Sequence, residues 1–229
     1  MKSKILIFLI FLLGLFIFSY PKTSKVVNKA VLKKEVETFQ EVKIPQEEKK
    51  EKQKKVDKCN TQISEHNVTF IDPFSSANKE LDQSDDCKKL YAEEKDDEIF
   101  ASLEIPKLNL MLPVYLGSSQ YILSKAIGHV EGSSLPVGGK SSHTILSGHR
   151  GMIRKEMFRN IDKLKPGDLF YIHVLNDTLT YQVYSQEIVK PHEIESLVII
   201  PDKDLVTLFS CHPFYEFDER ILVHGQRVN

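Results

Sequence analysis

The stretch LVTLFSCHPFYEFDERILVHG, residues 205–225, contains two apolar runs that are separated by a short loop. Short runs that are rich in β-branched and aromatic residues predict β-strands. Cys211 ends the first run, and Arg220 begins the second run nine positions later. The sequence therefore predicts a cysteine at the end of one strand and an arginine at the start of the next.

Similar short runs, separated by Gly, Pro, Asn and Asp, continue over residues 98–229 and predict one mainly β domain, either a barrel or a sandwich. A short helix is expected over 119–127. A second short amphipathic helix is expected over 153–161, because apolar residues recur there at helical spacing and Pro166-Gly167 then stops the pattern. The expected strands are 98–105, 109–116, 143–148, 168–174, 179–190, 204–211 and 220–227.

Residues 1–20 predict a signal anchor. Lys2 and Lys4 precede an apolar run from Ile5 to Phe18, and no small-residue cleavage pattern follows it. We therefore expect a single-pass membrane protein whose lysines stay inside and whose remaining chain is exported. A cleaved signal peptide is the alternative, and it leads to the same compartment. Residues 21–55 are rich in Lys and Glu and predict a charged, solvated stalk that is partly helical.

Residues 56–97 predict a helical region with an internal break. Helices are expected over 56–66 and 78–95, and the break contains the tripeptide Asp72-Pro73-Phe74. Pro73 has no backbone donor and favours an extended conformation in the residue before it. On its own, this tripeptide is most simply an ordinary turn.

Composition excludes several classes of function. The 229 residues include 31 basic and 32 acidic side chains, a net charge of −1, which argues against a nucleic-acid-binding surface. The cysteines at 59, 87 and 211 lack the close spacing of a zinc site, and their odd number leaves at least one free thiol. The sequence contains no phosphate-binding glycine loop, redox dithiol or convincing calcium cluster, so we expect neither metal nor cofactor.

Cys211 is open to two interpretations. A cysteine at a strand end is often a small buried apolar residue, whereas a nucleophilic thiol needs access and a neighbouring base or cation. His149 ends another apolar strand, in HTILSGHRG, and the strand ends of a barrel could bring it to Cys211 and Arg220 at one rim. His143 lies on the same face but further from the rim, and His212 points to the face opposite Cys211.

Three segments resemble the sortases, the cysteine transpeptidases of Gram-positive cell surfaces. These are TILSGHRG at 144–151, VTLFSCHPF at 206–214 and ERILVHGQRV at 219–228, which are similar to the family's histidine, cysteine and arginine segments. The resemblance extends over about residues 56–228, and the linking sequence is most similar to class C, the pilin-polymerising branch. It implies a closed β-barrel of about eight strands with short connecting helices and N-terminal helices that carry a lid loop.

The resemblance also assigns the site residues. It implies Cys211 as the nucleophile and His149 as the general acid that protonates the leaving amine and later deprotonates the incoming one. Arg220 is implied as the cation that stabilises the oxyanion. The family's usual Cys-Thr-Pro-Tyr is replaced here by Cys211-His212-Pro213-Phe214. Class C enzymes commonly carry a second, C-terminal membrane span, whereas this sequence ends at Asn229.

Within this resemblance, Asp72-Pro73-Phe74 is similar to the lid of pilin sortases. Asp72 would pair with Arg220, Phe74 would cover Cys211 and Pro73 would stiffen the loop. Cys59 and Cys87 flank this lid in segments that predict helices, and we hypothesise that they form a disulfide that limits its movement. Two unrelated free thiols are the alternative.

The expected function is a membrane-anchored sortase that cleaves an LPxTG-like sorting signal through a thioester. It would then join the acyl group to an amine, for which a pilin lysine is favoured. One alternative is a sortase that anchors surface proteins or pili to a cell-wall peptide amine. Less favoured are a non-catalytic pilus assembly factor and a plain cysteine hydrolase.

Overall fold

The fold is a closed barrel of eight strands, as the sequence resemblance implied. The computed structural model describes residues 2–66, 72–75, 87, 90, 98–152, 154–193, 195–213 and 218–228. Strands neighbour one another in the order β1-β2-β3-β4-β7-β8-β6-β5. The pairs β2–β3 and β4–β7 are parallel, and the other pairs are antiparallel. The strands are β1 Ala101–Ile105, β2 Leu110–Leu116, β3 Ile127–His129, β4 Ser142–Ser147, β5 Leu169–Val174, β6 Asp177–Val189, β7 Asp204–His212 and β8 Glu219–Arg227.

The barrel interior is filled by apolar side chains from all sides of the sheet. Phe170 and Tyr181 stack inside it, with ring centroids 5.5 Å apart. Gly225 on β8 makes room for them, because a Cβ at this position would lie 2.4 Å from the Phe170 ring. Close packing of this kind fixes the register of β8 against β6 and β7.

Two sequence expectations for the segments between strands need correction. The helix expected over 153–161 is wrong, because the described part of this segment forms turns and only the 3₁₀ turn Ile161–Lys163 follows. Met157 has a left-handed φ of 38°, which interrupts a helix, while Phe158 is buried in the core. The helix expected over 119–127 is α4, Gln120–Lys125, and the chain then enters β3, a three-residue strand that the sequence pattern did not predict.

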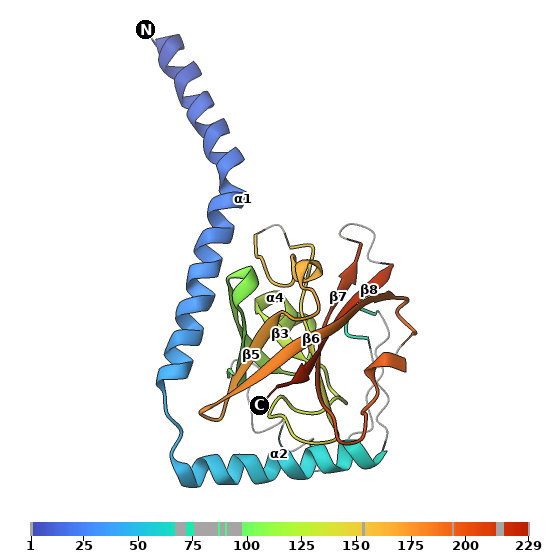
Figure 1. Cartoon of the computed structure of the whole chain (residues 1–229). Helices are drawn as coiled ribbons and strands as arrows, with labels where there is room; N and C mark the ends of the chain where they lie inside the picture. The colour runs from blue at the N-terminus through green and yellow to red at the C-terminus, as the bar shows by residue number, and fades with distance from the viewer. Residues whose placement is uncertain are drawn as a thin grey trace.

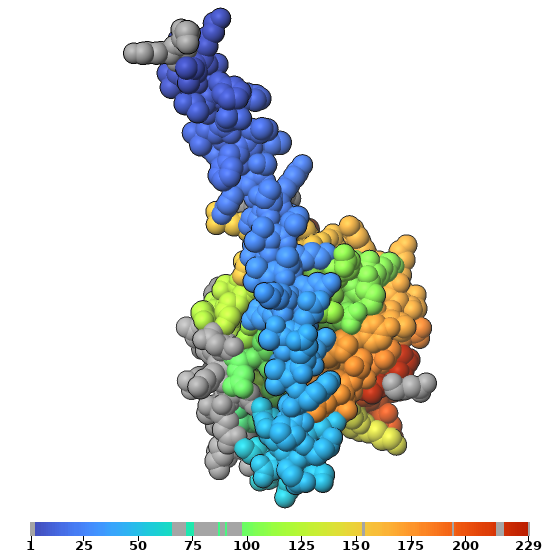
Figure 2. Space-filling model, turned by 90° about the vertical axis from the view of Figure 1, so that its left-hand side faces the viewer, coloured from blue at the N-terminus to red at the C-terminus, as the bar shows by residue number. Residues whose placement is uncertain are grey.

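The N-terminal region contains two helices, α1 Lys2–Glu41 and α2 Gln46–His66. Among the residues that the structure describes, α1 is the helix long and apolar enough to cross a membrane. Its N-terminal part projects past the barrel, and its C-terminal half lies along the barrel wall (Figures 1 and 2). The segment expected as a stalk is thus helical and contacts the barrel. Glu35 accepts a hydrogen bond from the Tyr115 hydroxyl at 2.9 Å, and Gln40 donates to Ser102 at 3.0 Å.

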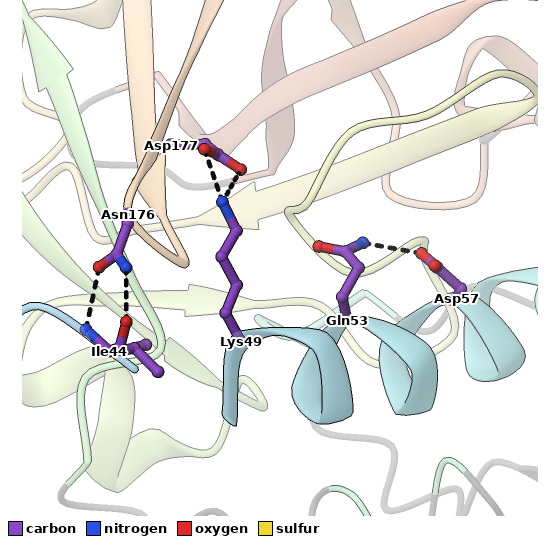
Figure 3. A network of polar contacts seen from close by, with 6 residues as sticks. All are labelled: Ile44, Lys49, Gln53, Asp57, Asn176 and Asp177. Carbon is purple, nitrogen blue, oxygen red and sulfur yellow. Dashed lines mark hydrogen bonds and ion pairs between the residues drawn. The ribbon is translucent and has the colours of Figure 1, made fainter. Parts of the chain in front are cut away.

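Polar contacts attach α2 and the link before it to the turn between β5 and β6 (Figure 3). Asn176 forms two hydrogen bonds with the backbone of Ile44, at 2.9 and 3.1 Å. Lys49 contacts both carboxylate oxygens of Asp177, at 2.8 and 2.7 Å. These bonds hold α2 across one end of the barrel, below it in the view of Figure 1.

A disulfide joins Cys59 of α2 to Cys87, 28 positions later in the sequence. Both sulfurs are buried in the main apolar core, and Cys211 is left as the free thiol. Of the helix expected over 78–95, only residues 87 and 90 are among the described residues, and both are helical.

Candidate active site

Cys211 and Arg220 face each other across neighbouring strands. Cys211 is the second-last residue of β7 and Arg220 is the second residue of β8, and the two are direct partners in the antiparallel register. Directly opposed residues project from the same face, with Cβ atoms about 5 Å apart. Both side chains are buried, with 7% and 4% of their residue surfaces exposed.

His149 reaches the same rim from β4. β4 runs parallel to β7, with Ser147 paired to Phe209, and the Gly148 amide donates to the Phe209 carbonyl at 3.2 Å. His149 and Cys211 each lie two residues beyond this last pair, at the same end of the two strands. Gly148 leaves room for the Ile127 side chain of β3, because a Cβ there would lie 2.5 Å from it. The three residues singled out from the sequence therefore converge on one rim of the barrel.

Asp72 reaches the same place from the segment 72–75 and binds Arg220. Its Oδ2 accepts hydrogen bonds from Nε and Nη2 of Arg220, at 2.9 and 2.7 Å. Its Oδ1 accepts from the Phe74 amide at 2.9 Å, and its carbonyl accepts from the Ser75 amide at 3.0 Å, which closes a tight turn. Asp72 is only 8% exposed, so the ion pair is almost completely removed from water.

The Phe74 ring packs among the site residues. It lies 5.5 Å from the His149 ring, 5.9 Å from the parallel Phe209 ring and 5.7 Å from the guanidinium carbon of Arg220. It thereby contacts two of the three candidate catalytic side chains. That Phe74 also covers Cys211 stays a prediction.

Neither the Cys211 thiol nor the His149 imidazole is charged in this conformation. Burial raises the pKa of the Cys211 thiol to about 11; the charge of Arg220 lowers this pKa and that of Asp72 raises it. Burial also lowers the pKa of His149 below its ordinary value of 6.5. At pH 7, Cys211 is therefore a neutral thiol and His149 a neutral imidazole. Asp72 opposes thiolate formation both by its own charge and by engaging Arg220.

Arg150 is a site residue that the sequence interpretation missed. It is 7% exposed, and its Nη1 lies 2.6 Å from Nδ1 of His212, the residue after Cys211. Its Nη2 pairs with Asp162 at 3.0 Å, and its Nε donates to the Arg159 carbonyl at 3.3 Å. Arg150 thus joins the loop after His149 to the end of β7. Its position next to His149 was the only signal in the sequence.

His143, the competitor of His149 in the sequence, belongs to a separate buried network. Its Nδ1 contacts the Val198 carbonyl at 2.9 Å and its Nε2 contacts the Thr207 hydroxyl at 2.7 Å. Thr207 in turn contacts His224 at 2.8 Å, and His224 contacts Glu187 at 3.0 Å. These partners satisfy His143 within the barrel, so its role is structural.

Comparison with known proteins places this geometry in context. Residues 103–228 match the sortase domain model. Sortase D of Bacillus subtilis is 30% identical over 129 residues, which cover 55% of this chain and 62% of that protein, so this chain spans less than two thirds of it. A crystal structure of Streptococcus pneumoniae sortase C matches with a TM-score of 0.74 and 34% identity, over 87% of this chain and 97% of that one. Sortase C-1 from Actinomyces oris matches with a TM-score of 0.71 and 35% identity, over 79% and 99% of the two chains.

Proposed function

The chain belongs to the sortase family, whose members are cysteine transpeptidases, and we propose that it cleaves an LPxTG-like sorting signal and transfers the acyl part to an amine. The observation that carries this proposal is the convergence of His149, Cys211 and Arg220 at one rim of the barrel. A nucleophile, a proton carrier and a fixed cation are the three groups that this reaction requires.

In the proposed reaction, the Cys211 sulfur attacks the threonine carbonyl carbon and gives up its proton to His149. Arg220 stabilises the oxyanion that forms. The Thr–Gly bond then breaks, and His149 gives its proton to the departing glycine amine, which leaves a thioester on Cys211. An incoming amine attacks this thioester and its proton passes to His149. The sulfur then leaves and takes this proton from His149, which restores the Cys211 thiol and the neutral imidazole.

We assign Asp72, Pro73 and Phe74 to a lid that gates this reaction. The Asp72 carboxylate occupies two donors of Arg220, which therefore cannot bind an oxyanion at the same time. The Phe74 ring occupies space beside His149 that a substrate would need. Lid opening would expose the site before the chemistry begins.

For the acceptor, we favour the amine of a pilin lysine over a cell-wall peptide. Two observations support this choice. The structural neighbours are sortase C enzymes, one of them described in terms of pilin substrate specificity. The Asp72 carboxylate accepts a hydrogen bond from Arg220, which is the pairing that the resemblance to the lid of pilin sortases implies. We also assign α1 to the membrane, with the barrel on the outer side.

The test is polymerisation of the major pilin of the same organism by the full chain, beside Cys211→Ala and the double variant Asp72→Ala/Phe74→Ala. Covalent ladders on denaturing gels that disappear in Cys211→Ala and strengthen in the lid variant support a lid-gated pilin polymerase. Cleavage of the sorting signal without ladders supports the wall-anchoring alternative. Ladders that persist in Cys211→Ala contradict the assigned nucleophile, and the absence of both cleavage and thioester supports a non-catalytic assembly factor.

A further inference from the structure

A row of hydrogen-bonded groups crosses the four neighbouring strands β4, β7, β8 and β6. His143 of β4 contacts the Val198 carbonyl through Nδ1 at 2.9 Å and the Thr207 hydroxyl of β7 through Nε2 at 2.7 Å. Thr207 contacts Nδ1 of His224 on β8 at 2.8 Å, and Nε2 of His224 contacts the Glu187 carboxylate of β6 at 3.0 Å. We call these five groups, from the Val198 carbonyl to the Glu187 carboxylate, the four-bond network. Its three inner side chains are at most 3% exposed, so they depend on one another for hydrogen bonds.

The four-bond network lies on the face of the barrel that carries the nucleophile. Thr207, Phe209 and Cys211 occupy alternate positions of β7, so their side chains project from the same face. Phe209 and its register partner Leu222 form an apolar floor between the network and Cys211. Thr207 and Cys211 are four strand residues apart, a distance of about 13 Å. The network is thus one layer of side chains away from the candidate active site.

The network also holds part of the connection between β6 and β7, residues 195–200, which we call the Val198 segment. Leu197 of this segment packs in the same apolar cluster as Phe209, and the carbonyl of the next residue, Val198, contacts His143. Phe74 of the proposed lid stacks on the same Phe209 ring, with centroids 5.9 Å apart. A shift of the Val198 segment therefore changes the apolar cluster in which Phe74 lies.

The four-bond network needs one proton more than its neutral groups supply. The Val198 carbonyl and the Glu187 carboxylate, at its two ends, can only accept hydrogen bonds. Between them, neutral His143, neutral His224 and the Thr207 hydroxyl each supply one proton. Four contacts of 2.7–3.0 Å therefore share three protons. All four are hydrogen bonds only when the network binds one extra proton.

The extra proton is most stable on His224, the histidine beside the carboxylate. As an imidazolium, His224 donates to Glu187 and to Thr207, Thr207 donates to Nε2 of His143, and Nδ1 of His143 donates to Val198. Without the extra proton one bond is lost. Hydrogen bonds to an ionised group are about twice as strong as neutral ones, so the bond to Glu187 is kept. Thr207 then donates to His224, His143 donates to Thr207, and Nδ1 of His143 faces the Val198 carbonyl without a proton.

The groups around His224 determine the pH at which this proton binds. The titratable groups that face His224 are Glu187 and Tyr184 of β6 and His143 of β4. Burial lowers the pKa of His224 below its ordinary value of 6.5, and the bond to Glu187 acts against this shift. Burial raises the pKa of Tyr184 and lowers that of His143 to about 4, so these two side chains stay neutral at pH 5–8. The network should therefore take up its extra proton below pH 6.5.

We propose that the four-bond network positions the Val198 segment in a proton-dependent way: one bound proton fixes the segment to the barrel beside the active site, and loss of this proton releases it. The effect on catalysis rests on the proposed function, since it requires a sorting signal to replace Phe74 on the Phe209 ring. His143, Thr207 and His224 act through the segment and are positioning residues.

Nitrogen-15 NMR of the full chain with labelled histidine, in detergent micelles, counts the protons of the network. Spectra of His143→Gln and His224→Gln assign the two rings. At pH 5 we expect His224 to be protonated on both nitrogens and His143 on Nδ1. At pH 8 we expect both rings to be protonated on Nε2 alone. A His143 ring that keeps one tautomer at both pH values contradicts the proposal.

The absence of tryptophan from the sequence allows the Val198 segment to be followed by fluorescence. Val198 is 55% exposed, and Val198→Trp adds a single indole while it leaves the backbone carbonyl in place. We expect the fluorescence anisotropy of this indole to fall between pH 5 and pH 8, with the same midpoint as the tautomer change of His143. An anisotropy that is constant over this range overturns the proposal.

Two variants made in the Val198→Trp chain test the proton count. Glu187→Gln replaces an acceptor by a group whose amide can donate to Nε2 of His224, so all four bonds form without an extra proton. Its anisotropy should stay at the high value at both pH values. Thr207→Val interrupts the network and should give the low value at both. Glu187 is 39% exposed, so Glu187→Gln remains a test even where Thr207→Val fails to fold.

His173 provides the matched control on another part of the barrel. It contacts Glu104 at 2.9 Å and the Thr178 hydroxyl at 3.0 Å, the same residue types as in the network. His173→Gln, made in the Val198→Trp chain, should retain the full pH dependence of the anisotropy. Equal effects of His173→Gln and Glu187→Gln, or a Glu187→Gln chain that still responds to pH, contradict the proposal.

Cleavage of a sorting-signal peptide measures the consequence for the active site. Wild type and Glu187→Gln share the same catalytic residues, so the ratio of their KM values isolates the effect of the network. We expect this ratio to be close to one at pH 5 and at least threefold at pH 8, and a ratio that does not change with pH contradicts the link to the site. Tautomer and anisotropy changes without any cleavage overturn the proposed function alone. Cleavage without these changes overturns the four-bond network alone.

Discussion

Asp72 and Arg220 are 148 positions apart in the sequence, and the Asp72 carboxylate accepts two hydrogen bonds from the Arg220 guanidinium at 2.9 and 2.7 Å. Both side chains are nearly inaccessible to water. Breaking a buried pair by removing one partner is costly, because the remaining charge is left uncompensated. Removing either member should therefore open the proposed lid.

The first prediction concerns the reactivity of the thiol. Asp72→Ala should speed the alkylation of Cys211 by iodoacetamide at pH 8 at least tenfold, and should lower the thiol pKa from its present value of about 11. The physical reason is that burial and the Asp72 charge both raise this pKa, and the substitution relieves both. Because Cys59 and Cys87 form a disulfide, alkylation reports Cys211 alone. Asp57→Ala on α2 is the matched control, and an equal rate in the two variants contradicts the lid.

The second prediction concerns Arg150. Arg150→Gln should reduce kcat for peptide cleavage about tenfold, because the end of β7 loses its bond from His212 to the loop that follows His149. Asp162→Asn is the control, since it removes only the ion pair, whose carboxylate is 41% exposed. This control substitution should lower kcat for peptide cleavage less than threefold. If the two variants have the same kcat, the contact with His212 does not position the nucleophile.

The third prediction concerns Gly148. Gly148→Ala places a Cβ 2.5 Å from Ile127 and 3.0 Å from the Phe158 ring. Overpacking of this kind costs about 1–3 kcal/mol of stability and shifts the backbone. We expect cleavage activity to fall more than tenfold at a temperature where circular dichroism shows the variant to be folded. Unchanged activity would mean that the packing of Gly148 against Ile127 and Phe158 does not set the position of His149.

The fourth prediction concerns the dependence of stability on pH. Burial lowers the pKa of His129 and of His143 from 6.5 to about 4. Between these values the unfolded chain binds more protons than the folded one, so the free energy of unfolding falls as the pH falls through this window. Each histidine contributes a loss of about 3 kcal/mol by pH 4. Urea unfolding at pH 7 and pH 5 should show that the free energy of unfolding decreases less for His143→Gln than for wild type between these pH values. Equal decreases contradict the account.

The fifth prediction concerns the disulfide. Replacing Cys59 and Cys87 together by serine should lower the free energy of unfolding by about 3–4 kcal/mol, because a 28-residue loop is no longer closed in the unfolded state. Residues 72–74, the proposed lid, lie within this loop. Alkylation of Cys211 should therefore also become faster, and a rate equal to that of wild type would mean that the disulfide does not restrain the lid.

The sequence predicted those parts of the fold whose signal is local and strong. Seven of the eight strands were recognised, because each is at least five residues long and so shows a local pattern in the sequence. β3 was missed, since Ile127–His129 is too short to show a period and depends on pairing with Leu146 and Ser147. The apolar residues of 153–161 have helical spacing, but Met157 and Phe158 lie in turns and are buried in the core from there.

For the site, the sequence pattern predicted a cysteine and an arginine at facing strand ends, and the register places Cys211 opposite Arg220. The contact between Asp72 and Arg220 came only from family resemblance, because no local signal joins residues so far apart in the chain. Arg150 was not recognised for a similar reason. Its contact with His212 arises only when β4 and β7 pair.

The most direct test of the central claim is the intact mass of the full chain after brief incubation with a sorting-signal peptide. The account predicts an adduct equal to the acyl part of the peptide, mapped to Cys211, removed by hydroxylamine and absent from Cys211→Ala. Cleavage of the peptide at an undiminished rate by Cys211→Ala, or an adduct on any other residue, would contradict it.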